Sequence, residues 1–234
     1  MTSSRHSSLN PLTLNPSGIG MNETLIIFTR YPEPGKTKTR MIPELGATGA
    51  ADLQRQLSEH TIHTAQILQQ SRPIDIEIHF AGGDRSLMSS WLGNHHSYYL
   101  QASGDLGAKM TSAFHDAFER GKQRIVIIGI DCPDINSVIL NQAFNSLKDN
   151  QLVLGGAEDG GYYLIGLSKL VPELFLNINW GTDSVFSSTR KIAQQLALSI
   201  DYLPVLPDVD RPEDLEIAKR HNLKFYRKKT SKVD

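Results

Sequence analysis

Short runs of β-branched and aliphatic residues alternate with longer amphipathic runs along most of this chain. The runs expected to form strands are residues 24–28, 74–80, 97–100, 124–130, 152–154 and 162–166. Apolar residues recur with helical spacing in residues 49–70, 106–120, 137–147 and 183–198. A last helix is expected to begin at Pro212, because proline suits the first turn of a helix. This alternation predicts an α/β fold whose mostly parallel sheet is flanked by helices.

The chain has room for one large domain. Its 234 residues can bury a substantial core, and residues 23–223 contain no internal repeat or low-complexity block. Residues 1–22 are rich in Ser, Thr, Asn, Pro and Gly, so we expect a disordered extension, with Met21 as a candidate initiator. We expect residues 224–234 to form a basic C-terminal tail.

Composition and missing motifs disfavour several classes of protein. The formal net charge of −1 gives no reason to expect nucleic-acid binding, and no run approaches the ~20 apolar residues of a membrane span. The single cysteine, Cys132, excludes an internal disulfide and fits a reducing, cytoplasmic compartment. The sequence has neither a Gly-x-Ser-x-Gly nucleophile elbow nor a Gly-x-Gly-x-x-Gly segment after the first expected strand. A serine hydrolase and a dinucleotide-dependent dehydrogenase are therefore disfavoured, and the oligomeric state stays open.

The first expected strand runs into a loop that carries four cations. A Pro-Glu-Pro-Gly segment at residues 32–35 excludes a helix there and indicates a turn. The cations are Arg30, Lys36, Lys38 and Arg40. Ligands of α/β proteins usually bind at the carboxyl ends of the strands, so these side chains are candidates for binding phosphate groups. Gly35 would let backbone N–H groups approach the same ligand. The alternative is a solvated cationic loop.

Two aspartates at expected strand ends are candidates for binding a metal ion. Asp131 directly follows the apolar run that ends at residue 130, and Pro133 stops the strand. A carboxylate in that position can hold Mg²⁺ or Mn²⁺ together with the phosphates of a substrate. Asp210, shortly before Pro212, is the candidate for a second ligand, although it could equally cap the helix that follows.

A third acidic segment lies between two pairs of glycines. Glu158 and Asp159 are flanked by glycines at 155–156 and 160–161, so backbone and carboxylates can both approach a ligand. These carboxylates are candidates for a general base or for binding an acceptor hydroxyl, whereas a tight hairpin turn is the alternative. Asp183, close after Trp180, is a weaker candidate for the same role and could instead cap a helix.

Taken in order, these segments resemble a family of small bacterial proteins, DUF2064. The family is also identified with glycosyltransferases found beside radical-SAM and arsenosugar-biosynthesis genes. The matching segments are residues 32–40, 104–110, 129–134, 157–166, 180–183 and 208–214. The resemblance covers about residues 24–215, and it departs from the family pattern at Arg30, where a lysine is usual, and at Ile130, where a serine is usual.

The resemblance implies a fold, an activity and a metal. The fold would be the three-layer α/β/α GT-A type of the nucleotide-diphospho-sugar transferases, with a mostly parallel central sheet. The activity would be a metal-dependent transfer of a sugar from a nucleotide-diphospho-sugar donor to a small-molecule acceptor. Asp131, with Asp210, would hold Mg²⁺ or Mn²⁺, and the cations of the first loop would bind the donor's phosphates.

Two alternatives remain open on the sequence. A nucleotidylyltransferase of the same fold would use a nucleoside triphosphate and release pyrophosphate, and the density of cations in the first loop favours it. A non-catalytic module that binds a nucleotide sugar is the other alternative. It is disfavoured because such a module would need neither Asp131 nor the carboxylate pair at Glu158 and Asp159.

Overall fold

A computed structural model of the chain describes residues 21–225, so almost all of the expected N-terminal extension and C-terminal tail lies outside the described residues. A seven-stranded sheet with the order β3-β2-β1-β4-β6-β5-β7 forms the centre of the described part. Its strands are β1 (Glu23–Arg30), β2 (Asp75–Ala81), β3 (Ser97–Leu100), β4 (Arg124–Ile128), β5 (Leu152–Ala157), β6 (Tyr162–Leu167) and β7 (Ile200–Leu206). Only β6 runs antiparallel to its neighbours β4 and β5, so the expected mostly parallel sheet is confirmed.

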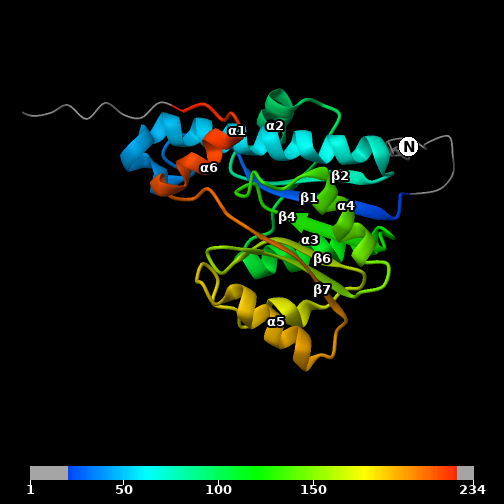
Figure 1. Cartoon of the computed structure of the whole chain (residues 1–234). Coiled ribbons are helices and arrows are strands. Elements are labelled where there is room, and N and C mark those ends of the chain that lie inside the picture. Colours follow the sequence, from blue (N-terminus) through cyan, green and yellow to red (C-terminus); the bar gives the residue numbers. More distant parts are fainter. Residues whose placement is uncertain (1–20, 226–234) are drawn as a thin grey trace, which may run out of the picture.

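Helices cover both faces of this sheet, as Figure 1 shows. They are α1 (Ile42–Ser71), α2 (Arg85–Leu92), α3 (Leu106–Glu119), α4 (Ser137–Ser146), α5 (Val185–Gln195) and α6 (Leu215–Arg220). Side chains from α1, α2, α4 and α6 share one buried cluster with the sheet. Side chains from α3, α5 and the short 3₁₀ helix Pro172–Phe175 form a second cluster on the other face. The result is the three-layer α/β/α architecture that the sequence pattern predicts.

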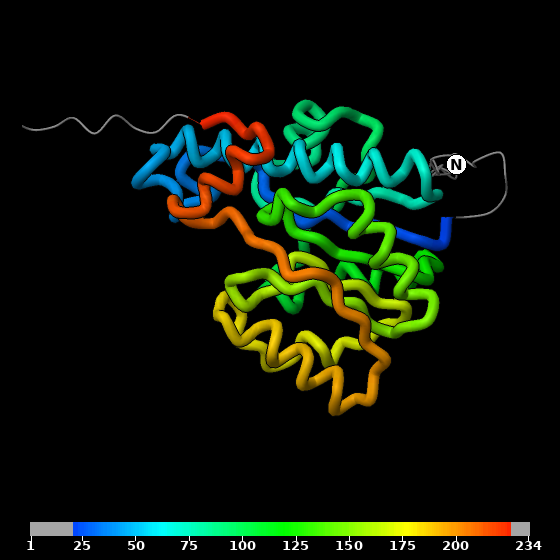
Figure 2. Tube along the Cα trace, viewed as in Figure 1, coloured from blue at the N-terminus to red at the C-terminus, as the bar shows by residue number. Residues whose placement is uncertain are grey.

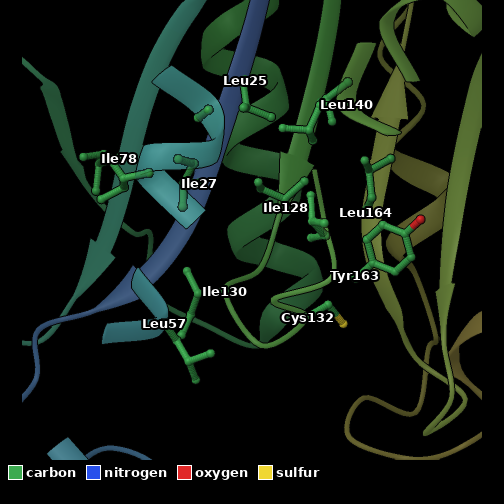
Figure 3. Close-up of a cluster of buried hydrophobic side chains, with 14 of the residues drawn as sticks. Leu25, Ile27, Leu57, Ile78, Ile128, Ile130, Cys132, Leu140, Tyr163 and Leu164 are labelled. Carbon is green, nitrogen blue, oxygen red and sulfur yellow. The ribbon is translucent and has the colours of Figure 1, made fainter. Parts of the chain in front are cut away.

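Apolar strand residues point alternately to these two clusters. Leu25 and Ile27 of β1 pack on the α1 side, whereas Ile26 packs on the α3 side, and all three side chains are fully buried. Figure 3 shows Ile27 beside Ile78 of β2, and Leu57 of α1 beside Ile130, in the cluster on the α1 side. Burying a side chain of this size contributes roughly 1.5–3 kcal/mol, so the double-sided burial explains why the strand sequences are apolar without alternation.

The first helix is longer than its sequence pattern indicates. Apolar spacing predicts a helix from residue 49, but α1 begins at Ile42, with a proline in its first turn. The two parts are joined at Gly46, whose φ of 71° interrupts the helix. A residue with a Cβ rarely adopts this conformation, so glycine permits the break.

Two elements do not appear among the expected runs. Helix α2 has only eight residues and buries a single side chain, Met88, so its sequence contains no long apolar pattern. Strand β7 contains Pro204, which normally argues against a strand. The proline is tolerated because β7 is the outermost strand, and only one of its sides is paired.

The last part of the chain crosses the molecule. After β7, residues 207–225 pass from the α5 side to the amino-terminal end of α1, as the orange and red trace in Figure 2 shows. A short 3₁₀ helix at Pro212–Asp214 precedes α6, so the expected helical start at Pro212 is confirmed with a tighter first turn. Among residues 21–225, no helix combines the length and the apolar composition needed to cross a membrane.

Candidate active site

A cavity of about 350 Å³ opens at the carboxyl end of the central strands. Three carboxylates border it, and they belong to Asp131 after β4, Asp159 after β5 and Asp208 after β7. Arg40, from the basic loop, lies at the same cavity. The remaining lining residues are mainly apolar or aromatic and come from β1, α3, β4, β6 and the start of α5. The chain therefore brings charged residues from four separate loops to one opening, at the sheet edge where α/β proteins bind ligands.

Lys38 ties the basic loop to the other two strand ends. Its side chain is only 4% exposed, and its Nζ lies 2.8 Å from Oδ1 of Asp131. The same ammonium donates a hydrogen bond to the carbonyl of Val209 and lies 3.8 Å from Oδ1 of Asp210. The backbone of Val209 in turn donates to the carbonyl of Asp131, at 2.7 Å. Lys38 is thus a buried cross-brace in the free protein, which the sequence did not reveal.

Arg40 is placed differently from Lys38. Its guanidinium forms an ion pair with Asp210, and that hydrogen bond and the charge of Asp210 raise the pKa of Arg40. The side chain is nevertheless 61% exposed, and it also borders two shallower hollows beside the cavity. Arg40 is therefore the cation of the loop that a ligand in the opening can contact most directly.

Asp208 is the least compensated carboxylate of the site. Burial, followed by the negative charges of Asp159, Asp214 and Asp131, raises the pKa of Asp208 to about 6. Within residues 21–225, no lysine, arginine or histidine forms an ion pair with it. The sequence shows Asp208 and Asp210 one residue apart, and only the structure shows that Asp208 faces the cavity while Asp210 is engaged by Arg40.

The acidic loop between β5 and β6 is a tight turn as well as part of the site. Oδ1 of Asp159 accepts a hydrogen bond from the backbone N–H of Gly161 at 2.8 Å, which holds the turn. Glu158 and Asp183 are exposed and border a neighbouring hollow of about 360 Å³ together with Asp159. A Cβ at Gly160 would lie 2.2 Å from the carbonyl oxygen of Asp183, so glycine allows the two loops to touch.

Three residues predicted to bind phosphate lie apart from the others. Lys36 is 62% exposed and pairs with Glu33 at 2.7 Å. Arg30 is exposed at the end of β1, and Gly35 lies in an open turn with a φ of 82°. None of Arg30, Gly35 and Lys36 borders the cavity or the two hollows beside it. Their role in binding a donor stays a prediction.

Comparisons with known proteins identify the family. The family described as "Uncharacterized protein conserved in bacteria (DUF2064)" matches residues 64–182, which is half of the chain. The chain belongs to the DUF2064 family. The link to radical-SAM and arsenosugar genes stays a prediction. No curated protein matches the chain.

Solved structures confirm the expected fold. A presumed nucleotide-diphospho-sugar transferase from Desulfovibrio desulfuricans G20 is 33% identical, with a TM-score of 0.81 over 91% of this chain and 90% of that one. The 4-diphosphocytidyl-2C-methyl-D-erythritol synthase of Anaerococcus prevotii DSM 20548 is 11% identical, with a TM-score of 0.58 over 87% and 99% of the two chains. Rv0371c of Mycobacterium tuberculosis H37Rv, in a complex with manganese, is 14% identical, with a TM-score of 0.52 over 84% and 97%. The last two likenesses concern the fold alone.

The donor atoms at the opening of this DUF2064 protein fit a hard divalent cation. Asp131 and Asp208 offer carboxylate oxygens, which Mg²⁺ and Mn²⁺ prefer. Burial and then the neighbouring carboxylates raise the pKa of Asp208, so a bound cation would stabilise its charged form. Within residues 21–225, no three His, Cys, Asp or Glu side chains are already gathered closely enough to enclose a metal ion. A bound cation would therefore complete its coordination with phosphate oxygens and water, as Mg²⁺ commonly does.

The structure also shows site residues that sequence reasoning missed. Tyr162 of β6 and Met110 of α3 border the cavity together with Trp180. They come from elements far apart in the chain, and their periodicity marks them only as core residues. Cys132 is buried at the cavity edge, and burial raises the pKa of its thiol well above the usual range, so it is a packing residue and a poor nucleophile.

Proposed function

We propose that this DUF2064 protein is a metal-dependent glycosyltransferase that moves a sugar from a nucleotide-diphospho-sugar donor to a small-molecule acceptor. One observation carries the proposal: the basic loop and three carboxylates, Asp131, Asp159 and Asp208, meet at the opening of one cavity. Cations and a metal site at one point suit a diphosphate, which needs positive charge on several oxygens. The name of the 33% identical relative from D. desulfuricans agrees with such a donor.

Arg40 and Lys38 would bind the donor's diphosphate. Arg40 is exposed at the opening, so it can contact phosphate oxygens at once. Lys38 is held by Asp131, and its positive charge stabilises that carboxylate next to the phosphates. Arg30, Gly35 and Lys36 lie outside the cavity, so they would contact a donor only at its outer end.

Asp131 and Asp208 would hold Mg²⁺ or Mn²⁺. The sequence suggests Asp210 as the second ligand, but the ion pair with Arg40 occupies that carboxylate, whereas Asp208 faces the cavity. We therefore propose Asp208 in place of Asp210. A cation held there would supply Lewis-acid stabilisation of the negative charge that develops on the departing diphosphate.

The transfer breaks one bond and forms one bond. The bond between the sugar's anomeric carbon and the diphosphate oxygen breaks, and the nucleoside diphosphate departs with the electron pair. The acceptor's hydroxyl oxygen forms the new bond to the anomeric carbon, and its proton passes to a carboxylate. Asp159 is the candidate for that base because it borders the cavity, whereas Glu158 and Asp183 border the hollow beside it and would orient the acceptor.

Nucleotidylyl transfer is the second candidate. It is favoured by the shared fold with the A. prevotii synthase, whose name describes a diphosphocytidyl product. In that reaction the acceptor would attack the α-phosphate of a nucleoside triphosphate, and pyrophosphate would depart. The two reactions differ in the leaving group, which makes them separable by product analysis.

The test is a screen of nucleotide sugars and nucleoside triphosphates with and without Mn²⁺. A ligand that binds only the folded protein raises the melting temperature, so a metal-dependent shift identifies the donor class. Release of nucleoside diphosphate supports sugar transfer, and release of pyrophosphate supports nucleotidylyl transfer. Asp208→Asn should remove the metal-dependent shift, whereas Asp134→Asn, an aspartate that pairs with His221 away from the cavity lining, should keep it. If no nucleotide shifts the wild-type transition, the proposal fails.

A further inference from the structure

The cavity behind the three carboxylates has a chemical character of its own. We propose that it binds the acceptor by a compact apolar or aromatic group, and that the acceptor's hydroxyl then lies at the carboxylate opening. This proposal rests on the proposed function, because only a transferase has a donor and an acceptor. It further specifies the acceptor, as a molecule that carries both a hydroxyl and a compact apolar or aromatic group.

The inner end of the cavity is apolar. Ile127 of β4 and Ile165 of β6 are paired neighbours within the sheet, and both border the cavity below the strand ends. Met110 of α3 borders the same space from the helix that covers this face. The charged residues of the cavity instead lie in loops that follow the strands. A ligand that fills the cavity therefore meets carboxylates at one end and hydrocarbon at the other.

Few side-chain hydrogen-bonding groups reach the inner end of the cavity. The hydroxyl of Tyr162 donates to the sulfur of Met110 at 3.8 Å. The side chain of Tyr163 packs in the cluster on the α1 side, where its hydroxyl donates to the carbonyl of Pro204, so it does not serve the inner end. The buried indole N–H of Trp180 has no acceptor within the described part of the chain. A sugar-like acceptor would leave several hydroxyls without partners here, which is unfavourable, whereas an apolar group would not.

The aromatic wall is built before any ligand binds. The indole ring of Trp180 packs directly against Gly107. Only glycine permits this contact, because a Cβ at residue 107 would lie 2.8 Å from the ring. Tyr162 meets Trp180 edge-on, with ring centroids 6.4 Å apart. On the same face of the sheet, Phe28 of β1 borders the cavity and stacks on His79, with ring centroids 5.8 Å apart. These contacts hold the aromatic side chains in place without a ligand. The volume of the cavity that they border suits one substituted ring.

The donor's phosphates would approach the carboxylates from another side. Lys38 and Arg40 border a separate hollow with Gln54 of α1, on the α1 side of Asp131. The apolar cavity extends instead toward the α3 side of the sheet. Asp131 lines both spaces, so a donor and an acceptor can occupy them together and meet at the carboxylates. This arrangement favours the acceptor, and not the donor's base, as the occupant of the cavity.

Gly129 provides a direct way to fill the cavity. It lines the cavity, its φ lies outside the left-handed region, and an added Cβ would have nothing within 4 Å. Gly129→Leu should therefore occupy the space that the acceptor's apolar group would take, without a clash with the backbone. Val138→Leu, on an α4 side chain that is 73% exposed, is the matched control.

The experiment uses benzyl alcohol as an apolar probe and glucose as a polar one. The chain has two tryptophans, so Trp91→Phe leaves Trp180 as the sole indole reporter at the cavity. We expect benzyl alcohol to change the emission of Trp180 in a saturable way, with millimolar affinity, and glucose to leave it unchanged. Gly129→Leu in this background should weaken benzyl alcohol binding at least tenfold, and Val138→Leu should not. Val185→Phe, at the start of α5, serves as a second filling variant if Gly129→Leu does not fold.

A nucleotide arm separates the two proposals. Thermal shifts with UDP-glucose, GDP-mannose and CTP in Mn²⁺ should be kept by Gly129→Leu, and a saturating nucleotide should leave benzyl alcohol binding intact. Competition between nucleotide and benzyl alcohol would assign the cavity to the donor and overturn the acceptor proposal. Absence of saturable benzyl alcohol binding, or equal binding by the filled variants, would overturn it as well. If benzyl alcohol binds and no nucleotide does, the proposed function fails while the apolar site remains.

Discussion

Carboxylates at the two ends of the central sheet have pKa values that are shifted in opposite directions. At the amino end, Glu23 of β1 is 7% exposed and accepts hydrogen bonds from Arg72 at 2.8 Å and from Arg124 at 2.6 Å. Burial alone would raise the pKa of Glu23, but the two guanidinium groups lower it below the ordinary value. At the carboxyl end, burial and three neighbouring carboxylates raise the pKa of Asp208 instead.

The opposite pKa shifts distinguish a carboxylate that stabilises the fold from one that is a candidate for binding a ligand. A carboxylate whose charge is balanced within the protein holds the fold together, whereas one that is left uncompensated favours a cation brought by a ligand. Asp75 of β2, paired with Lys122, repeats the balanced arrangement at the amino end. The carboxyl end balances Asp131 and Asp210 through the basic loop and leaves Asp208 without such a partner among residues 21–225.

The largest effect is expected from Asp208→Asn. Loss of one proposed metal ligand should lower the turnover rate on the order of 10²–10³-fold, because the departing diphosphate loses electrostatic stabilisation. Single-turnover kinetics with the donor found by the screen, together with Mn²⁺ titration calorimetry, measure the effect. Unchanged Mn²⁺ affinity would remove Asp208 from the metal site.

Glu23→Gln should destabilise the amino end of the sheet. Removing the charge leaves two arginines without their carboxylate in a largely buried pair, which should cost about 3 kcal/mol of unfolding free energy. Urea denaturation measures the loss, and the turnover of the folded fraction should be unaffected. A stable but inactive variant would show that the amino end also serves the reaction.

Lys38→Met tests whether the cross-brace is structural. The change leaves Asp131 without its ammonium partner and the carbonyl of Val209 without its donor, which should cost about 2 kcal/mol. Lys36→Met is the matched control, because that lysine is 62% exposed and forms only a surface pair. Equal unfolding free energies for the two variants would argue that Lys38 does not brace the loops.

The smallest effects are opposite dependences of stability on pH. The folded pKa of Glu23 is lowered, so its contribution is present above about pH 4.5 and is lost as the pH falls through the folded pKa. The folded pKa of Asp208 is raised to about 6, so stability decreases as the pH rises from about 4 to 6. In chelator, Asp208→Asn should thus gain about 1 kcal/mol over the wild type at pH 7 and nothing near pH 3, after allowance for partial exposure. Urea denaturation at both pH values checks the sign.

Much of the fold could be predicted because it depends on local patterns. The apolar strands, the amphipathic helices and the proline at residue 212 each report their element directly. Asp131 and the basic loop could be found because a strand end is visible in the sequence. Strand β7 is expected only indirectly, as the strand end before Asp210. Its bounds could not be predicted, because Pro204 argues against a strand unless its edge position is known.

The rest of the site depends on register and on distant contacts. Asp208 and Asp210 are equivalent in the sequence, and only the path of residues 207–211 decides which one meets Arg40. The aromatic wall combines Trp180 with Tyr162 and Gly107, which no local pattern connects. The burial of Lys38 likewise results from contacts with the other end of the domain.

Those contacts set the order in which the protein can become functional. Lys38 and Val209 are 171 residues apart, so the segment that carries Val209 leaves the ribosome long after Lys38. In a nascent chain, the ammonium of Lys38 has no acceptor from that segment until residue 209 has been synthesised and has left the ribosome. Ligand binding would therefore report a completed domain, and a chain stalled before residue 208 would fold in part without acquiring a site.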